Sequence, residues 1–138
     1  MATILIDKNV MVPMRDGVRL ATDVYRLDNA APAPVLLART PYDKERAVAS
    51  TGVPFDIMRA VQAGYTVVIQ DVRGRFASEG TFNAHFQEDR DGADTIAWAA
   101  VQPWSSGGVG TFGGSYVGCT QWIPAREQPR PCGRWPRQ

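Results

Sequence analysis

Cysteine, histidine and long apolar runs are all scarce in this sequence of 138 residues. Two cysteines, Cys119 and Cys132, cannot form the framework of a disulfide-rich secreted fold, so a reducing cytoplasm is the expected location. A single histidine, His85, argues against a multi-histidine metal site, and we expect neither a metal nor an organic cofactor. No apolar run approaches the ~20 residues of a membrane-spanning helix, so a membrane is not an expected partner.

An excess of charge of either sign is also absent. Fifteen Lys and Arg residues oppose fourteen Asp and Glu residues, which leaves a net charge of +1. A nearly neutral surface offers no electrostatic footprint for nucleic acid, so that partner is excluded as well. Hydrophobic residues make up 44% and charged residues 21%, a balance typical of a folded globular domain, and the length suits one domain.

Strand and helix patterns alternate along most of the chain. The Arg15–Gly17 segment has the Asp-Gly chemistry of a turn and separates two strand patterns, which predicts an opening β-hairpin. Strands then alternate with helices, which predicts an α/β fold with a mostly parallel sheet and helices on both faces. The expected strands are Val10–Met14, Val18–Tyr25, Val35–Ala38, Tyr65–Gln70 and Val109–Phe112; the expected helices are Pro54–Ala63, Asp89–Val101, which Gly107-Gly108 should break, and Tyr116–Trp122.

A serine lies among glycines in the segment Val109–Gly118, after an apolar strand and before a helix. This setting is typical of a nucleophile elbow, a tight turn that lifts a serine hydroxyl above the sheet. Ser115 is therefore a candidate nucleophile, and the backbone amide of Tyr116 is a candidate oxyanion donor. The strict G-x-S-x-G pattern is not met, because Val117 replaces its second glycine. The residues alone leave open an architectural turn or a phosphate-binding loop.

Four further blocks accompany the elbow in a fixed order: Met11–Leu20, Arg39–Lys44, Gln70–Gly74 with Ala77–Gly80, and Gln102–Trp104. Over about residues 5 to 126 the chain resembles the serine hydrolases that include cocaine esterases, α-amino-acid ester hydrolases, glutaryl acylases and X-prolyl dipeptidyl-peptidases. The resemblance implies the N-terminal part of an α/β-hydrolase fold. It also implies hydrolysis of a small acyl ester, an amide or an X-Pro peptide through an acyl-enzyme on Ser115.

The same resemblance implies that the phenol of Tyr42 is a second oxyanion donor beside the amide of Tyr116. From local sequence alone, Tyr42 would be interpreted as a turn aromatic. We interpret Asp71, Arg73 and Glu79, which follow a strand, mainly as a structural ion network. Cys119, just inside the elbow helix, is expected to be a small buried packing residue.

The sequence contains no histidine after Ser115, although a triad in this fold runs Ser, Asp or Glu, then His. Glu127 is the only acid that follows Ser115. His85 precedes the elbow and is expected to be a loop histidine without a catalytic role. The helical cap and β-rich C-terminal domain implied by the resemblance are missing too. We therefore expect an N-terminal fragment that is inactive by itself.

The composition changes near the C-terminus, where proline and arginine crowd together. We expect residues 1–126 to be the N-terminal part of a hydrolase domain and residues 127–138 to be an aberrant tail. One hypothesis is a frameshift near Gln128–Arg130, because GC-rich back-translation read two bases later gives Ala-Leu-Arg-Ala-Val-Ala-Pro-Ala, a plausible helix end and strand start. Under it, Cys132 and Trp135 have no designed role; a divergent natural tail is the alternative.

Other functions also fit the residues. A non-catalytic α/β binding module could retain the elbow as architecture, and a small complete enzyme could use His85 as its base. If the strand at Val109–Phe112 lacks a further neighbour, its open edge favours aggregation. The sequence sets neither the acyl group nor the oligomeric state.

Overall fold

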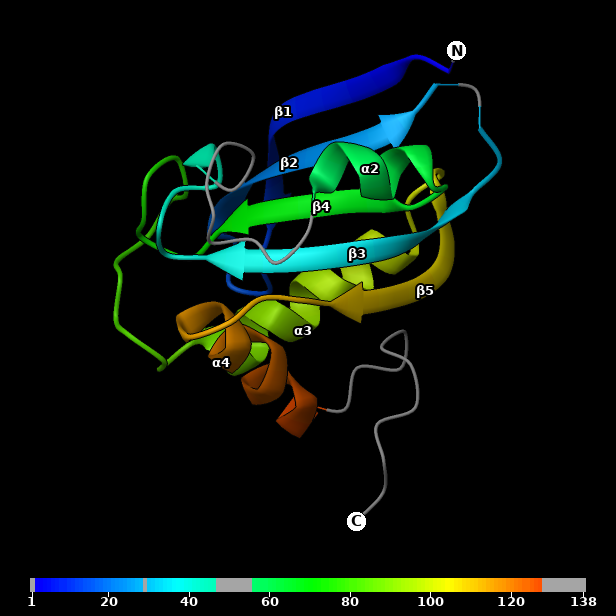
Figure 1. The fold of residues 1–138 in the computed structure, drawn as a ribbon. Coiled ribbons are helices and arrows are strands. Elements are labelled where there is room, and N and C mark those ends of the chain that lie inside the picture. The colour runs from blue at the N-terminus through cyan, green and yellow to red at the C-terminus, as the bar shows by residue number, and fades with distance from the viewer. Residues whose placement is uncertain (1, 29, 47–55, 128–138) are drawn as a thin grey trace.

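The computed structural model describes residues 2–28, 30–46 and 56–127. Five strands form one sheet in the order β1-β2-β4-β3-β5 (Figure 1). β2 is antiparallel to β1 and β4, whereas β3 is parallel to β4 and β5, so the sheet is mixed: the predicted opening hairpin is confirmed, and the predicted parallel pairing holds for β3, β4 and β5. The elements are β1 (Ile4–Pro13), β2 (Arg19–Leu27), β3 (Ala33–Thr40), α2 (Ile57–Gln62), β4 (Thr66–Asp71), α3 (Glu88–Ala100), β5 (Ser105–Thr111), α4 (Tyr116–Trp122) and the 3₁₀ helix η1 (Ile123–Glu127).

The opening hairpin turns at Gly17, which adopts a φ of +87° and donates its amide to the carbonyl of Met14 at 2.9 Å. This is the left-handed backbone that the Asp-Gly pair predicts. The prediction for the first strand was wrong in extent, because β1 begins at Ile4 rather than Val10. The register shifts between Asp7 and Val10, so the polar residues there interrupt the apolar alternation without ending the strand.

Helices cover both faces of the sheet, as predicted, with α2 on one side and α3 on the other (Figure 1). β4 is buried along its whole length, and its side chains divide between two cores. Val67 and Ile69 pack with Ile57 and Val61 of α2. Val68 points the opposite way and packs with Ile96 of α3. This alternation between the two cores explains why Val67, Val68 and Ile69 are all apolar.

The predicted helices are confirmed where the structure describes them, with small changes at their ends. α2 starts after Asp56, whose carboxylate accepts the amides of Met58 and Arg59. Pro54, the expected start, lies outside the described residues. α4 has the predicted bounds. Of the expected tail, Glu127 closes η1, whereas residues 128–138, including Cys132 and Trp135, lie outside the described residues.

The glycine pair before the elbow does not break the chain's regular structure as expected. α3 already ends at Ala100, and Gly107 and Gly108 lie within β5. β5 pairs with β3 at Ser105 and again at Val109, with a register shift between them. Gly107 has a φ of +99°, which lets the backbone make this irregularity and return to the ladder. Among the described strands, β5 is an edge of the sheet.

The parallel strands β3, β4 and β5 end at the same edge of the sheet (Figure 1). Tyr42 follows β3, the loop from Val72 to Gln87 follows β4, and Ser115 follows β5. In open α/β sheets, ligands bind at this edge. The fold therefore gathers the candidate residues where chemistry is expected. No described helix has the length and apolar character needed to cross a membrane.

A buried ion pair ties these segments together. Arg39, at the end of β3, contacts Glu88 at 2.6 Å, and the two side chains are 2% and 4% exposed. The Nε of Arg39 also donates to Gln70 at 2.7 Å, and its carbonyl accepts the hydroxyl of Thr120 on α4. Within the described part of the chain, the Nη2 atom of Arg39 has no hydrogen-bond partner. The carboxylate of Glu88 thus provides the main electrostatic compensation for burying the Arg39 guanidinium.

Replacing Glu88 with Gln should destabilise the chain by about 3–5 kcal/mol, because it leaves the Arg39 cation buried without a counter-charge. Urea unfolding of the 138-residue chain would measure this loss. The double variant Arg39→Met/Glu88→Gln should recover part of it. Glu79→Gln, which breaks an exposed ion pair with Arg19, is the matched control and should change stability little. Equal effects of Glu88→Gln and Glu79→Gln would contradict the role of the buried pair.

Candidate active site

Ser115 occupies a strained turn between β5 and α4. Its φ of 57° and ψ of −127° are rarely adopted by a residue with a side chain and cost on the order of 1–3 kcal/mol. The residue is exposed, and its side chain makes no capping hydrogen bond to α4. The carbonyl oxygen of Ser115 accepts a hydrogen bond from the amide of Cys119, and this is the first hydrogen bond of α4. The hydroxyl is therefore carried on an exposed, strained turn and is not engaged in capping α4.

Gly113 makes this turn sterically possible. It has a φ of +126°, and a Cβ placed on it would lie 2.1 Å from Cγ1 of Val117. An added methyl group at that distance requires the turn to open. Gly114, in contrast, has open space around it. The glycine two residues before Ser115 therefore permits the close return of the helix over the turn.

Tyr116 lies among aromatic side chains at the edge of the sheet. Its ring stacks on that of His85, with centroids 4.5 Å apart, and the ring of Phe82 lies 6.2 Å away. The hydroxyl accepts the amide of His85 at 3.1 Å and donates to Glu88 at 3.3 Å. Partial burial raises the pKa of the Tyr116 phenol, and the charge of Glu88 adds to the rise against the opposing bond from His85. The phenol is thus a neutral anchor for the residue after Ser115.

Tyr42 follows the end of β3 and reaches the same place. Its ring meets that of Tyr116 edge-to-face, with centroids 6.4 Å apart and an interplanar angle of 74°. The side chain is 55% exposed, and its backbone amide donates to the hydroxyl of Thr40. The structure therefore brings Tyr42, which follows β3, against the ring of Tyr116, which directly follows Ser115 beyond the end of β5.

The two ionisable residues considered as a base or an acid are His85 and Glu127, and they lie in different parts of the structure. His85 has a φ of 68° and stacks on Tyr116; in the described contacts no hydrogen bond joins its imidazole to Ser115. Glu127 ends η1 and contacts Arg15 at 3.6 Å. Neither arrangement resembles a nucleophile that is hydrogen-bonded to a base, with the base in turn hydrogen-bonded to a carboxylate.

The charged residues after β4 do not pair with one another as the expected network required. Arg73 binds Asp91 and Asp16, and Glu79 binds Arg19. The carboxylate of Asp71 accepts backbone amides instead. Except for the bond from Ala77 to Asp71, these contacts join the segment to other parts of the chain, so the residues are structural but do not pair with one another. Cys119 also differs from expectation, because it is half-buried rather than buried.

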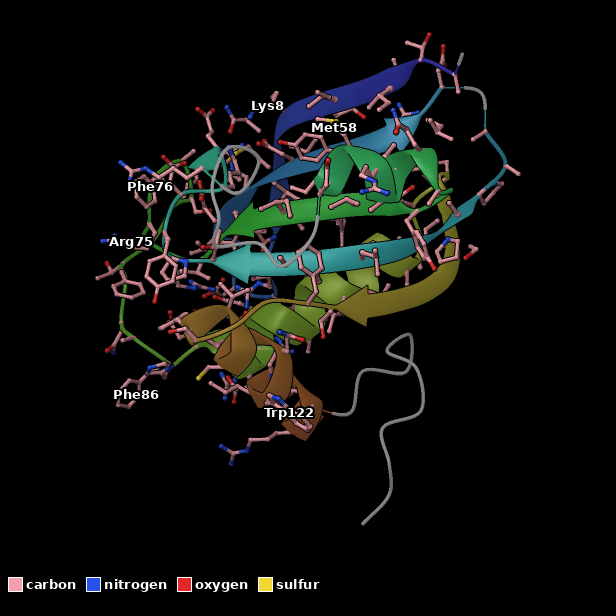
Figure 2. All side chains as sticks on the ribbon, viewed as in Figure 1. Lys8, Met58, Arg75, Phe76, Phe86 and Trp122 are labelled. Atoms are coloured by element: carbon pink, nitrogen blue, oxygen red, sulfur yellow. The ribbon has the colours of Figure 1, made fainter. Side chains whose placement is uncertain are left out.

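Exposed aromatic residues, which the sequence analysis did not single out, border this edge. Figure 2 shows Arg75, Phe76 and Phe86 on the loop beyond the ends of β3 and β4. The guanidinium carbon of Arg75 lies 5.1 Å from the centroid of Phe76 and 5.2 Å from that of Phe82. These cation–π contacts join Arg75 to two aromatic rings of the loop that carries His85.

Two observations limit what else the described residues can bind. They contain no group of three His, Cys, Asp or Glu side chains able to hold a metal ion. A hollow of about 680 Å³ lies at the opposite edge, where β3 and β4 begin, and is remote from Ser115. Its lining includes Arg26, Tyr65 and Trp104. The chemistry of the elbow is therefore separate from this hollow.

The sequence matches a known protein family and a characterised relative. Residues 16–132 match the family described as X-Pro dipeptidyl-peptidase (S15 family). The chain is 53% identical over 120 residues to the cocaine esterase of Rhodococcus sp., a match that covers 87% of this chain and 21% of that enzyme. The chain thus spans about a fifth of the length of this relative.

Solved structures agree with the fold. An α-amino acid ester hydrolase superimposes with a TM-score of 0.81 and 31% identity, covering 94% of this chain and 24% of that one. A CocE/NonD family hydrolase from Staphylococcus aureus gives a TM-score of 0.83 at 28% identity, covering 94% and 26%. The sheet, the elbow and these matches agree: the chain belongs to the X-Pro dipeptidyl-peptidase (S15) family of esterases and peptidases, and has the fold of an N-terminal part of its α/β-hydrolase domain.

Proposed function

We propose that this chain supplies the nucleophile and the oxyanion-binding groups of a serine hydrolase that cleaves an acyl ester, an amide or an X-Pro peptide. The observation that carries the proposal is the backbone of Ser115, which is strained at a φ of 57° while its hydroxyl makes no capping bond. Strain of this kind persists where the surrounding structure enforces it, and it is common at catalytic turns. An exposed hydroxyl on such a turn is suited to nucleophilic attack.

The reaction follows from the groups near Ser115. The oxygen Oγ attacks the carbonyl carbon of the substrate, and the carbonyl oxygen becomes an oxyanion. The Tyr116 amide and the Tyr42 phenol donate hydrogen bonds to it. The leaving group then departs, and water hydrolyses the acyl-enzyme. A base must accept the proton of Ser115 in the first step and return it to the leaving group.

The chain alone is proposed to lack this base. His85 is the single histidine of the sequence, and its ring is stacked on Tyr116. The relatives extend over four to five times the matched length, so a base and its carboxylate are proposed to come from polypeptide beyond the matched region. The proposal therefore concerns a catalytic half-site whose activity requires the remainder of such a domain.

Replacing Ser115 with Ala tests the nucleophile in a grafted enzyme, defined as the Rhodococcus cocaine esterase with its 120 matched residues replaced by those of this chain. We expect kcat for a nitrophenyl ester to fall by about 10⁶-fold, because the nucleophile acts as a unit with its base. Ser106→Ala, at an exposed position on β5, is the matched control and should leave kcat unchanged. A fully active Ser115→Ala variant would show that the elbow is only architecture.

The 138-residue chain by itself should hydrolyse the same ester more slowly than the grafted enzyme, by a factor on the order of 10⁴ or more, because it has no base for Ser115. Steady-state rates of the two proteins measure this ratio. Comparable rates that survive His85→Ala would contradict the missing base. Comparable rates lost in both His85→Ala and Ser115→Ala would instead identify a small complete enzyme.

Tyr42→Phe in the grafted enzyme should lower kcat by about 10²–10³-fold with little change in KM, because the phenol binds the oxyanion and not the ground-state substrate. Tyr65→Phe removes a hydroxyl from an exposed tyrosine at the opposite edge and is the control. Equal kinetics of the two variants would remove Tyr42 from the oxyanion site.

A further inference from the structure

Three hydrogen bonds attach the segment around Tyr42 to the chain that leaves β4. The amide of Val72 donates to the carbonyl of Thr40 at 3.0 Å. The Nε of Arg75 donates to the carbonyl of Pro41 at 3.1 Å. The amide of Lys44 donates to Oδ1 of Asp71 at 2.8 Å. Tyr42 thus lies on a short bridge that is fixed on both sides, and Asp71 fixes its far end.

The carboxylate of Asp71 is built into this place. It is fully buried, and its other oxygen accepts the amide of Ala77 at 3.3 Å. One carboxylate therefore joins the Tyr42 segment to the loop after β4. Both bonds are charge-assisted when the group is ionised, and such bonds are the stronger kind. Burial raises the pKa of Asp71, and the hydrogen bonds from the amides of Lys44 and Ala77 oppose that rise by favouring the ionised form.

The position of Lys44 is fixed from a second side. Its ammonium group contacts Asp23 on β2 at 3.2 Å, and the two side chains are 2% and 0% exposed. The intervening residue Asp43 adopts a φ of +79°, which is a strained conformation for aspartate. A segment that keeps this strain must be held by its neighbours. The hydrogen bonds at Thr40 and Lys44 fix both ends of this segment, and only three residues lie between them.

Resting on the proposed function, we propose that Asp71 is a positioning residue: through the backbone amide of Lys44, it sets the place of the Tyr42 phenol at the oxyanion site. It touches neither substrate nor Ser115. Its effect on the reaction passes through Tyr42 alone. Removing it should therefore loosen the Tyr42 segment and lower the rate only while the phenol is present.

Hydrogen exchange in the 138-residue chain tests the structural half of this proposal without any activity. In Asp71→Asn, amides of residues 40–46 should exchange about tenfold faster, because the acceptor pair for Lys44 and Ala77 is altered. Amides of β4 should exchange as in the unaltered chain. Ser78→Ala is the matched control, because it removes the bond from the Ser78 hydroxyl to the Asp71 carbonyl at 2.6 Å but leaves the carboxylate in place. Exchange of residues 40–46 unaffected by Asp71→Asn would overturn the proposal.

A double-mutant cycle in the grafted enzyme tests the catalytic half. Asp71→Asn should lower kcat about tenfold with KM unchanged, and should have no further effect in the Tyr42→Phe background. Additive losses in the cycle would overturn the proposal, because they indicate a general structural defect. If Asp71→Asn does not fold, Thr40→Val replaces it: this change removes the acceptor of the Tyr42 amide and should show the same dependence on the phenol.

Failure of the proposed function gives a different result. If Tyr42→Phe leaves kcat unchanged while Asp71→Asn still speeds exchange, the phenol has no oxyanion role, and the positioning claim is overturned with it. The Ser115→Ala variant then still reports on the nucleophile. Fast exchange confined to residues 40–46 together with non-additive kinetics would support the proposal.

Discussion

The buried pair of Arg39 and Glu88 is the interaction on which the candidate site depends. Arg39 is the last residue but one of β3, Glu88 begins α3, and Tyr116 of α4 donates to the same carboxylate. Three elements that are distant in sequence are therefore joined at the edge where the parallel strands end. Because both charges are buried, the pair contributes little if both are exchanged for apolar groups but is costly to break. Its value lies in fixing one arrangement of strand, helix and elbow.

Tyr42 and Ser115 reach this edge by separate routes, and each is held by its own backbone. The elbow is set by local constraints: the φ of Ser115, the close approach of Val117 to Gly113, and the first bond of α4. The Tyr42 segment is set by bonds to the chain after β4. A preorganised pair of donors can stabilise charge in a transition state without reorganising, which is the physical advantage of placing them on rigid elements.

The sequence was sufficient for features that local chemistry decides. The Asp-Gly turn at Gly17, the alternation along β4 and the bounds of α4 follow from the conformational preferences of a few neighbouring residues. Ser115 could be singled out for the same reason. Tyr42 could be proposed as an oxyanion donor only through the resemblance to a family, because nothing near it in sequence distinguishes such a donor from a turn aromatic.

Features set by distant partners were missed. β5 includes Gly107 because β3 lies beside it, and β1 starts at Ile4 because β2 continues to Leu27. Arg39 and Glu88 carry no sign in sequence that they meet, since they are 49 residues apart. The partners of the Asp71 carboxylate were also unexpected, because they are backbone amides, which every residue but proline offers.

A crystal structure of the grafted enzyme inhibited by a phosphonate ester tests the central claim most directly, since the phosphonyl group mimics the tetrahedral intermediate. We predict a covalent bond from phosphorus to Oγ of Ser115. We also predict a phosphonyl oxygen about 2.7–3.1 Å from both the Tyr42 hydroxyl and the Tyr116 amide. An adduct on another residue, or an oxygen directed away from both donors, would contradict the account.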